Sequence, residues 1–407
     1  MNDLVVVSLE RWDEVWRRNQ HLVSGLLRAD PDLRVLFVEP PDDPLHALQR
    51  RARPEFGHGV RRIGDRLHAV RPVKWLPRRL DPRADDRMQR TIARAAARIG
   101  MSDPLLWIND PRADGLARRT GWRTLYDLTD DWLAAERPDA EMRRVAAGEE
   151  WLLAHAGAVV ACSDELRRRK AAQRADIAVV RNGVDTAAYR LAQPRPADLP
   201  DGAVALYLGT LHRDRLDVDL CVRTAAALGA PDGSAAPDAA APGVADSASP
   251  DSAPSGAIAA PGGAAGGGTV VLVGPNALDD ADTALLRAAG VLVLGARPHE
   301  TVIGYLQHAG ALLVPHVVTA FTESLDPLKL YEYQAAGRPV VSTPVAGFRE
   351  AAGAQIRIAD RDRFADVVRE TLATMSSDIA PAPHPAPAVD WSLRVAEMQA
   401  VLAEARS

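Results

Sequence analysis

The stretch SLDPLKLYEYQAAGRPVVSTP, residues 324–344, contains both kinds of element from which the rest of the chain is built. Asp326 is favourable immediately before a helix, Pro327 is tolerated at the first helical position, and residues 328–336 are mostly strong helix formers. Gly337 is typical of the position just past a helix, so the helix is predicted to end there. The apolar run PVVSTP then predicts a buried strand. A helix followed at once by a buried strand is typical of an α/β domain with a parallel sheet.

Short apolar runs of the same kind recur along the chain and fall into two series. Stretches of helical composition, such as residues 81–99 and 140–156, separate most of them. This alternation predicts two doubly wound, Rossmann-like α/β domains whose facing edges form a cleft, the usual ligand location in this architecture. The predicted strands are residues 4–9, 34–39, 105–109, 124–128, 158–163 and 177–182 in the first series, and residues 203–209, 269–274, 291–295, 311–316 and 339–344 in the second.

The domain boundaries follow from composition. We predict a first domain at residues 1–187, a linker at 188–202 and a second domain at 203–377. Residues 231–268 are almost wholly Ala, Pro, Gly, Ser and Asp, so they are predicted to form a disordered insertion in the second domain. After a further proline-rich stretch, residues 388–407 are predicted to contain a last amphipathic helix.

Composition excludes several classes of protein. The chain has 407 residues, 47% of them hydrophobic and 25% charged, which is ordinary for a globular protein of two domains. Two cysteines cannot form a disulfide framework, and no Cys/His cluster has zinc spacing. We find no signal peptide and no apolar stretch long enough to span a membrane, so we expect a cytoplasmic protein.

Charge is unevenly spread over the chain, whose net charge is −5. Residues 1–187 contain 33 basic and 29 acidic residues, a balance of +4, and the remainder contains 16 and 25, a balance of −9. The basic excess is sharpest at residues 50–98, with 15 basic and 5 acidic residues. Such asymmetry suggests that the two domains have different partners.

Lys329 is notable because the chain has three lysines and forty-six arginines. On the predicted helix it lies one turn before Glu332, so the two side chains share a face. One interpretation is an ion pair on a solvated helix face. The other is an anion site, in which the helix N-terminus and the compact ammonium group bind a phosphate while the carboxylate accepts hydrogen bonds from neighbouring hydroxyls, as on a ribose.

The chain resembles glycosyltransferase family 4 and the related teichuronic-acid glycosyltransferases of GT-B fold. The resemblance covers most of the chain beyond about residue 105 and rests on the order and spacing of several segments. These are VVACSDELRRRK, VVRNGVD, LYLGTLHRDRLDVDL, VLVGP, LGARPHETVIGYLQHAGALLVPH and DPLKLYEYQAAGRPVVSTP. It implies a GT-B architecture with a C-terminal helix that crosses back to the first domain, and a second domain that binds a nucleoside-diphosphate sugar without a metal or other cofactor.

The resemblance also implies a set of donor-binding residues. Glu332 would take the ribose hydroxyls and Lys329 the diphosphate, and the turn at Gly209 and Thr210 would bring backbone N–H groups to the phosphates. Two arginines, Arg213 and Arg215, stand where the family places basic phosphate ligands, and we favour Arg213; either is otherwise a surface charge at a helix entrance.

The donor motif departs from the family pattern at one position. The family has a second glutamate where this chain has Ser324, and Glu323 lies one residue out of register. Either Glu323 substitutes or Ser324 and backbone groups contact the sugar. We include both, with Asp326, among the donor-site candidates, and the departure leaves the retaining stereochemistry of the family open for this chain.

Acceptor-side candidates come from the first domain. TLYDLTDDW, residues 124–132, ends a predicted strand with Asp127, Asp130 and Asp131, which we expect in a turn facing the cleft. Asp130 matches the family position best and would act as general base in an inverting reaction, or position substrate in a retaining one; the alternative is a helix cap. Trp12 and Trp16 either stack on an acceptor ring or pack into the core.

The basic region 50–98 includes VKWLPRR, residues 73–79, and suits an anionic lipid surface or a lipid-linked acceptor. A solvated helix in an arginine-rich protein is the alternative, and no nucleic-acid-binding module is found. The sequence therefore predicts a glycosyltransferase that moves a sugar from a nucleoside-diphosphate sugar to a small-molecule or lipid-linked acceptor, in polysaccharide, glycolipid or natural-product glycoside synthesis. A sugar-nucleotide epimerase of GT-B fold and a non-catalytic nucleotide-sugar-binding relative are the alternatives.

Overall fold

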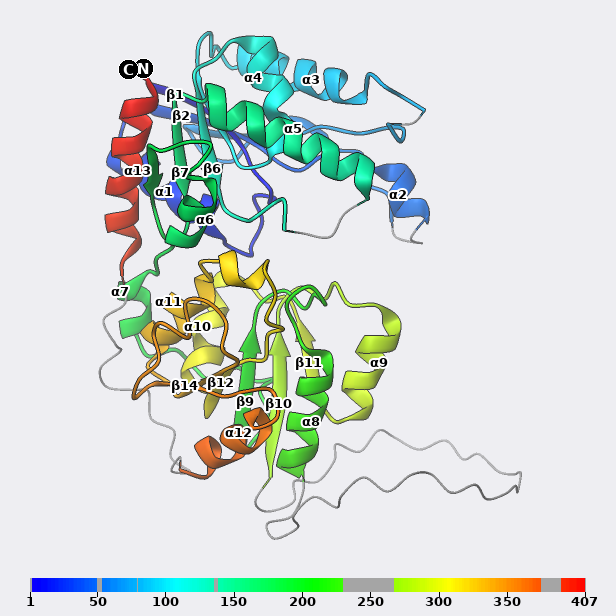
Figure 1. Cartoon of the computed structure of the whole chain (residues 1–407), viewed down its shortest axis with the longest axis vertical. Helices are drawn as coiled ribbons and strands as arrows, with labels where there is room; N and C mark the ends of the chain where they lie inside the picture. The colour runs from blue at the N-terminus through cyan, green and yellow to red at the C-terminus, as the bar shows by residue number, and fades with distance from the viewer. Residues whose placement is uncertain are drawn as a thin grey trace, which may run out of the picture.

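The computed structural model describes residues 2–49, 53–78, 80–134, 138–229, 267–374 and 389–406, and Figure 1 shows two layered α/β bodies, one above the other. Most of the predicted insertion 231–268 and of the proline-rich stretch before the last helix lies outside these residues. Gly268, which we placed in the insertion, is the first residue of a strand.

The first sheet contains eight strands among the described residues, in the order β3-β4-β2-β1-β5-β6-β7-β8. All neighbouring strands are parallel except the pair β3 and β4. Strand β1 lies between β2 and β5, so the strand order reverses there. The bounds are β1 Asn2–Val7, β2 Leu33–Val38, β3 His58–Arg62, β4 Leu67–Arg71, β5 Leu105–Ile108, β6 Thr124–Leu128, β7 Ala158–Ala161 and β8 Ile177–Val179.

The second sheet contains six described strands, all parallel, in the order β11-β10-β9-β12-β13-β14. Here the order reverses at β9, between β10 and β12. The bounds are β9 Ala203–Leu208, β10 Gly268–Val273, β11 Leu292–Gly295, β12 Ala311–Val314, β13 Val340–Ser342 and β14 Ile356–Ile358.

Helices cover both faces of each sheet because successive residues of each strand point to opposite sides. In β1, Val5 and Val7 pack toward one apolar cluster and Leu4 and Val6 toward another. The helices of the first half are α1 Arg18–Ala29, α2 Pro44–Gln49, α3 Ala84–Arg98, the short 3-10 helix η1 Pro111–Ala113, α4 Asp114–Thr120, α5 Asp139–His155, α6 Asp164–Lys170 and α7 Thr186–Arg190. Those of the second half are α8 Val218–Gly229, α9 Asp280–Ala288, α10 His299–Gln307, the 3-10 helix η2 Thr322–Ser324, α11 Leu328–Ala336, α12 Phe364–Ala373 and α13 Trp391–Arg406.

The last helix, α13, lies against the first body although it follows the second in sequence (Figure 1). Its apolar residues Trp391, Val395 and Met398 belong to the same buried cluster as Leu22 of α1. The fit is close, because a Cβ added at Gly25 of α1 would lie 2.2 Å from Cγ2 of Val395. This contact joins the end of the chain to the first sheet.

The helix with which the sequence analysis began occurs as predicted, with one correction at its start. Helix α11 spans Leu328–Ala336, and Gly337 ends it in the left-handed conformation with φ of 67°. The residue before the helix is Pro327, which offers no side-chain cap, rather than Asp326. The carboxylate of Asp326 instead accepts hydrogen bonds from the backbone N–H of Asn182, at 2.6 Å, and from the Tyr331 hydroxyl, at 2.8 Å.

Candidate functional site

A pocket of about 450 Å³ lies between the two bodies, at the carboxyl ends of strands from both sheets. The second body contributes residues that follow β9, β10 and β12 and the first turn of α11, and the first body contributes the loop after β1 and the turn after β6. Both sheets reverse their strand order at this edge, β1 in the first and β9 in the second. Such switch points are where open α/β sheets bind ligands.

Two glycines bring the loops after β9 and β10 together at the floor of the pocket. Gly209 has φ of 146° and Gly274 has φ of 143°, conformations that residues with a side chain rarely adopt. A Cβ at Gly274 would lie 2.1 Å from the backbone oxygen of Gly209. A Cβ at Gly209 would lie 3.0 Å from the Nζ of Lys329, so the glycine leaves the ammonium group space at the loop.

Lys329 lies at the second position of α11 and its side chain reaches the loop after β9. Its Nζ is 3.1 Å from Nε2 of His316 and 3.9 Å from the centroid of the Tyr207 ring. Burial and the nearby Arg215 guanidinium hold the pKa of Lys329 well below its usual value, and Glu332 offsets part of this shift. Among the ion pairs of the described residues, none includes Lys329. Lys329 therefore makes no direct ion pair in this part of the chain, and a bound anion would supply one.

Glu332 lies one turn further along α11 and also lines the pocket. Burial raises the pKa of its carboxyl group to about 7, and the Lys329 ammonium opposes this rise. None of the hydrogen bonds or ion pairs described for the chain involves its carboxylate. The half-buried carboxylate of Glu332 can therefore accept hydrogen bonds from ligand hydroxyls, and Lys329, one turn away, can bind a phosphate of the same ligand.

The structure reverses our preference between the two arginines. Arg215 lines the pocket, pairs with Asp214 at 3.0 Å and lies 5.6 Å from the centroid of the Phe321 ring. Arg213 is exposed, pairs with Asp282 of α9 and is not part of the pocket wall. The two arginines are two residues apart on a tight turn, so their side chains point in different directions. Sequence spacing alone does not reveal these directions.

The residues at the departure from the family motif lie away from the pocket. Ser324 is fully buried: its hydroxyl donates to the backbone oxygen of Phe321 and its own backbone oxygen accepts from the Ser163 hydroxyl. Glu323 pairs with Arg349 at 2.8 Å on another surface. The expectation that either contacts the sugar finds no support in this arrangement. Asp326 does line the pocket, but its carboxylate already accepts hydrogen bonds from the backbone N–H of Asn182 in the first body and from the Tyr331 hydroxyl in the second.

On the first body, Asp130 lines the pocket as expected, but its two neighbours do not. Asp127 is fully buried and accepts hydrogen bonds from Nε1 of Trp107 at 3.1 Å and from Nδ2 of Asn109 at 3.0 Å. Asp131 pairs with Arg169 at 2.6 Å, also outside the pocket wall. Our placement of both in the cleft is therefore wrong, because Asp127 still belongs to β6, where successive side chains alternate, and Asp131 has turned toward α6.

Glu10 is a pocket residue that the sequence analysis missed. It lies in the loop after β1, and burial raises the pKa of its carboxyl group to about 7, with Arg17 opposing and Asp130 adding to the rise. Glu10 and Asp130 both line this pocket. A carboxyl group whose pKa is near neutral is suited to accepting and donating a proton. Glu10 directly follows the predicted strand 4–9, and this position at the carboxyl end of a strand could have identified it.

The tryptophans of the same loop have different positions. Trp16 lines the pocket and stacks on His299 of the second body, with ring centroids 5.5 Å apart and planes 13° apart. Trp12 packs edge-on against Phe37 of β2 at 5.0 Å. Three histidines, His212, His299 and His316, also line the pocket and were not predicted, although His316 follows the apolar run of β12 by two residues.

Comparison with known proteins bears on both the fold and the second body. Residues 264–374 match the family model described as "Glycosyl transferases group 1". The structure of sucrose-phosphate synthase from Thermosynechococcus elongatus superposes with a TM-score of 0.62 at 14% identity, over 100% of this chain and 97% of that one. A structure of Anabaena HepE in complex with UDP and glucose superposes with a TM-score of 0.62 at 13% identity, over 99% of both chains.

The chain has the GT-B fold. The sequence resemblance to group 1 glycosyltransferases is confirmed by the family match and by a curated relative of Bacillus subtilis, "Putative teichuronic acid biosynthesis glycosyltransferase TuaH". That relative is 24% identical over 252 residues, 58% of this chain, and the match spans 55% of the relative's length.

The described residues contain neither a membrane-spanning helix nor a metal cluster. No described helix combines the length and hydropathy that crossing a bilayer requires. No group of three or more His, Cys, Asp or Glu side chains in the described residues is placed to hold a metal ion. The prediction that the reaction needs no metal stays a prediction.

Proposed function

We propose that this protein is a glycosyltransferase that moves a sugar from a nucleoside-diphosphate sugar to an acceptor hydroxyl. The observation that carries the proposal is that Lys329 and Glu332 line the same pocket one helical turn apart, and that neither is in any of the ion pairs of the described residues. The match of residues 264–374 to group 1 glycosyltransferases and the UDP-bound HepE structure of the same fold support it.

The diphosphate would lie at the close approach of the loops after β9 and β10. Thr210 would offer its backbone N–H group, whereas that of Gly209, which we had also expected to bind phosphate, already donates to the backbone oxygen of Val273 at 2.9 Å. Lys329 and Arg215 would offer positive charge. Glu332 would accept hydrogen bonds from the ribose hydroxyls. Because the two cations already lie there, charge that develops on the departing diphosphate would be stabilised without reorganisation of the site.

The acceptor hydroxyl would enter from the first body. Asp130 would receive its proton in an inverting reaction or hold the acceptor in a retaining one, and Glu10 is a second carboxyl group within electrostatic reach. Trp16 and His299 close this side of the pocket by stacking across the two bodies. Exclusion of water there favours transfer over hydrolysis of the donor.

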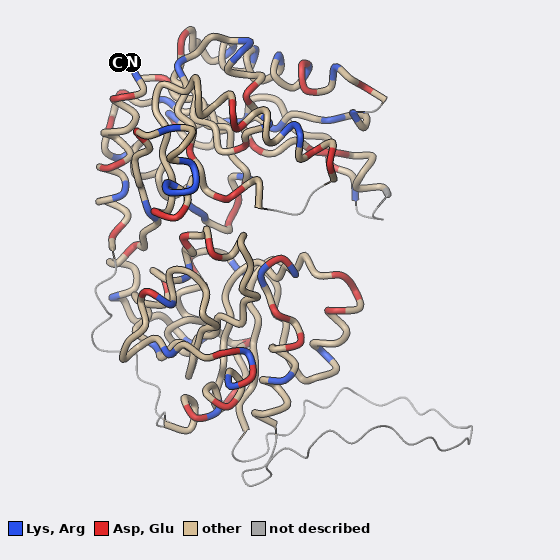
Figure 2. The backbone as a smooth tube through the Cα atoms, in the orientation of Figure 1, with Lys and Arg blue, Asp and Glu red and all other residues tan. Residues whose placement is uncertain are grey.

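We also propose that the protein acts at the cytoplasmic face of a membrane and touches the lipid through part of its basic region. Phe56, Trp75, Leu76 and Leu80 are exposed by 59%, 56%, 43% and 71%, which is unusual for large apolar side chains. Residues 50–98 contain 15 basic and 5 acidic residues, and Figure 2 shows where Lys and Arg lie along the backbone. Exposed aromatic and basic side chains together suit an anionic bilayer surface, where a lipid-linked acceptor would lie.

The function is tested by release of nucleoside diphosphate from UDP-, GDP-, dTDP- and ADP-sugars, with water as the acceptor in place of the unidentified hydroxyl compound. One donor should be turned over, and Lys329→Ala and Arg215→Ala should each reduce the rate roughly 10- to 100-fold, the value of a charge-assisted hydrogen bond. Arg213→Ala is the matched control and should retain activity. Equal loss in Arg213→Ala and Arg215→Ala, or turnover that survives Lys329→Ala, would contradict the assignment.

A further inference from the structure

A second pocket, of about 350 Å³, lies in the first body and is lined by none of Trp12, Trp16, Asp127, Asp130 and Asp131, although Lys74 and Arg78 of the basic region contribute to its wall. Its walls are formed by Ser8 and Leu9 after β1, by Pro40 after β2, and by Asp110 after β5, with α3 on the remaining side. Strand β1 lies between β2 and β5, so this pocket lies at the switch point of the first sheet. Its volume and position are those of a small-molecule site.

The interior of this pocket is mostly apolar. Val7 and Val38, at the ends of two strands, face Met88 and Ile92 of α3 across it, and Leu116 of α4 closes one side. Met88 is half-buried, so its side chain forms part of the wall while its outer end remains accessible. A ligand here would need an apolar face against these side chains.

Polar groups surround this apolar interior, and each cation on the wall has a carboxylate partner. Lys74 pairs with Asp43, and Arg78 pairs with Asp85 at 2.7 Å. Arg112 pairs with Asp110 at 2.8 Å and with Glu141 at 2.7 Å. A phosphate would therefore have to displace a carboxylate from its guanidinium or ammonium group, which is the reverse of the arrangement around Lys329.

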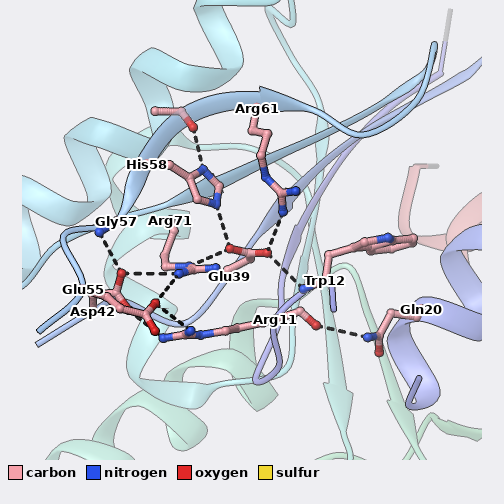
Figure 3. Close-up of polar contacts among 11 residues, drawn as sticks. Arg11, Trp12, Gln20, Glu39, Asp42, Glu55, Gly57, His58, Arg61 and Arg71 are labelled. Carbon is pink, nitrogen blue, oxygen red and sulfur yellow. Dashed lines mark hydrogen bonds and ion pairs between the residues drawn. The ribbon is translucent and has the colours of Figure 1, made fainter. Parts of the chain in front are cut away.

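The fourth carboxylate of the wall, Glu39, also has cationic and N–H partners (Figure 3). It is buried at the end of β2, where it accepts hydrogen bonds from Nε of Arg71 at 2.7 Å and from the backbone N–H of Trp12 at 3.0 Å. His58 Nε2 lies 2.9 Å from the same carboxylate. Neutralised carboxylate and guanidinium groups still have lone pairs and N–H groups to spare, which suit the hydroxyls of an uncharged ligand.

This pocket adjoins the pocket between the bodies, because Leu9 lines both. A molecule held in the second pocket would extend past Leu9 toward Glu10 and Asp130. We propose that the second pocket binds the body of the acceptor, and that this body is uncharged, bears hydroxyl groups and has an apolar face, as a sugar residue or a glycoside has. The inference rests on the proposed function and names the acceptor class for it.

The test uses two probes that share an apolar chain and differ in their head group, octyl β-D-glucopyranoside and octyl phosphate. Binding to the full chain is followed by ligand-observed NMR below the micelle-forming concentration. Met88→Trp fills the pocket from α3, and Ala97→Trp adds the same side chain at an exposed position of that helix. Ala113→Leu fills the pocket from the opposite wall if Met88→Trp does not fold.

The glycoside should bind to the wild type and to Ala97→Trp, and its affinity should fall at least roughly tenfold in Met88→Trp or Ala113→Leu, with octyl phosphate binding more weakly throughout. Tighter binding of octyl phosphate, glycoside binding that Met88→Trp leaves unchanged, or no binding of either probe would overturn the inference. Binding of UDP should be the same in all these variants, so a wild type that does not bind UDP would count against the proposed function and not against this pocket.

Discussion

At the scale of single residues, the donor site combines two groups whose charged forms the fold disfavours. Burial lowers the pKa of Lys329 and raises that of Glu332 to about 7. Each group is thus held at a cost in stability, and that cost is offset when a ligand brings the opposite charge or a hydroxyl pair. A scarce lysine at this position is consistent with a compact cation fitting against Gly209, where a planar guanidinium would be wider.

The raised pKa of Glu332 predicts a pH-dependent stability. A carboxyl group with a folded-state pKa above its unfolded value destabilises the fold as pH rises from about 4.5 to about 7, and the full cost is present above that window. Glu332→Gln should therefore raise the free energy of unfolding at pH 8 by roughly 1–3 kcal/mol and have little effect at pH 4.5. Urea denaturation at both pH values measures this.

Glu350→Gln is the control for that experiment, because Glu350 has 59% of its side chain exposed in the same body. It should change stability little at either pH. A Glu332→Gln variant that is less stable than the wild type at pH 8 would show that the carboxylate has a structural partner and is not held free for a ligand.

At the scale of elements, the sequence predicted what local chemistry determines. The bounds of α11 follow from helix formers and a C-terminal glycine, and apolar runs revealed most strands. The strands β3, HGVRR, and β4, LHAVR, were both missed because polar residues interrupt them and neither contains a continuous apolar run. The short strand β14 was missed for its length, three residues.

The same limit explains the errors in the site. Lys329, Glu332, Gly209, Thr210 and Asp130 all line the pocket. The family resemblance pointed to these residues, and their spacing of one turn on the predicted helix pointed to Lys329 and Glu332 as well. Side-chain direction cannot be read from such spacing. The side chains of Asp127, Arg213 and Ser324 therefore point away from the pocket, contrary to our prediction. Glu10 and His316, which do line the pocket, were not among our candidates.

Glu39 and its partners Arg71, His58 and the backbone N–H of Trp12, here called the Glu39 cluster, hold the loop after β1. We therefore predict that the Glu39 carboxylate stabilises the fold of this loop. Glu39→Ala would leave Arg71 and the backbone N–H of Trp12 without their buried acceptor. The variant should lose roughly 3–5 kcal/mol of stability, the usual result of breaking a buried ion pair from one side. Glu55→Ala is the comparison, because Glu55 pairs with the same arginine but is 51% exposed, and it should lose at most about 1 kcal/mol. Equal losses in the two variants, measured by urea denaturation, would show that the cluster contributes only as surface ion pairs.

At the scale of the whole molecule, two sheets present their switch points to one pocket and the last helix returns to the first body. Trp391 at the start of α13 stacks on His21 of α1, with centroids 4.8 Å apart, and His21 in turn lies 5.1 Å from His299 of the second body. The end of the chain thus lies beside the junction that closes the pocket. The sequence alone predicted two sheets and a last helix, and family resemblance supplied the crossing back of that helix.

The close fit of α13 on α1 predicts an unusual response to a glycine substitution. Alanine in place of a mid-helix glycine normally stabilises a helix by about 1 kcal/mol. Gly25→Ala should instead destabilise the chain by roughly 1–3 kcal/mol, because its Cβ would overlap Cγ2 of Val395. Adding Val395→Ala should remove the overlap and recover much of the loss, which thermal unfolding of both single variants and the double variant measures. Stabilisation by Gly25→Ala alone would show that α13 does not pack as described.

The nucleotide-sugar site is tested most directly by calorimetric titration of UDP, GDP, dTDP and ADP into the wild type, Lys329→Ala and Glu332→Gln. We predict that one diphosphate binds the wild type, that Lys329→Ala weakens it roughly 10- to 100-fold, and that Glu332→Gln weakens it through the ribose contact. Arg349→Ala, an exposed cation of the same body outside this pocket, should bind as the wild type does. If no diphosphate bound, or if binding survived both substitutions, the pocket between the two sheets would not be a nucleotide-sugar site.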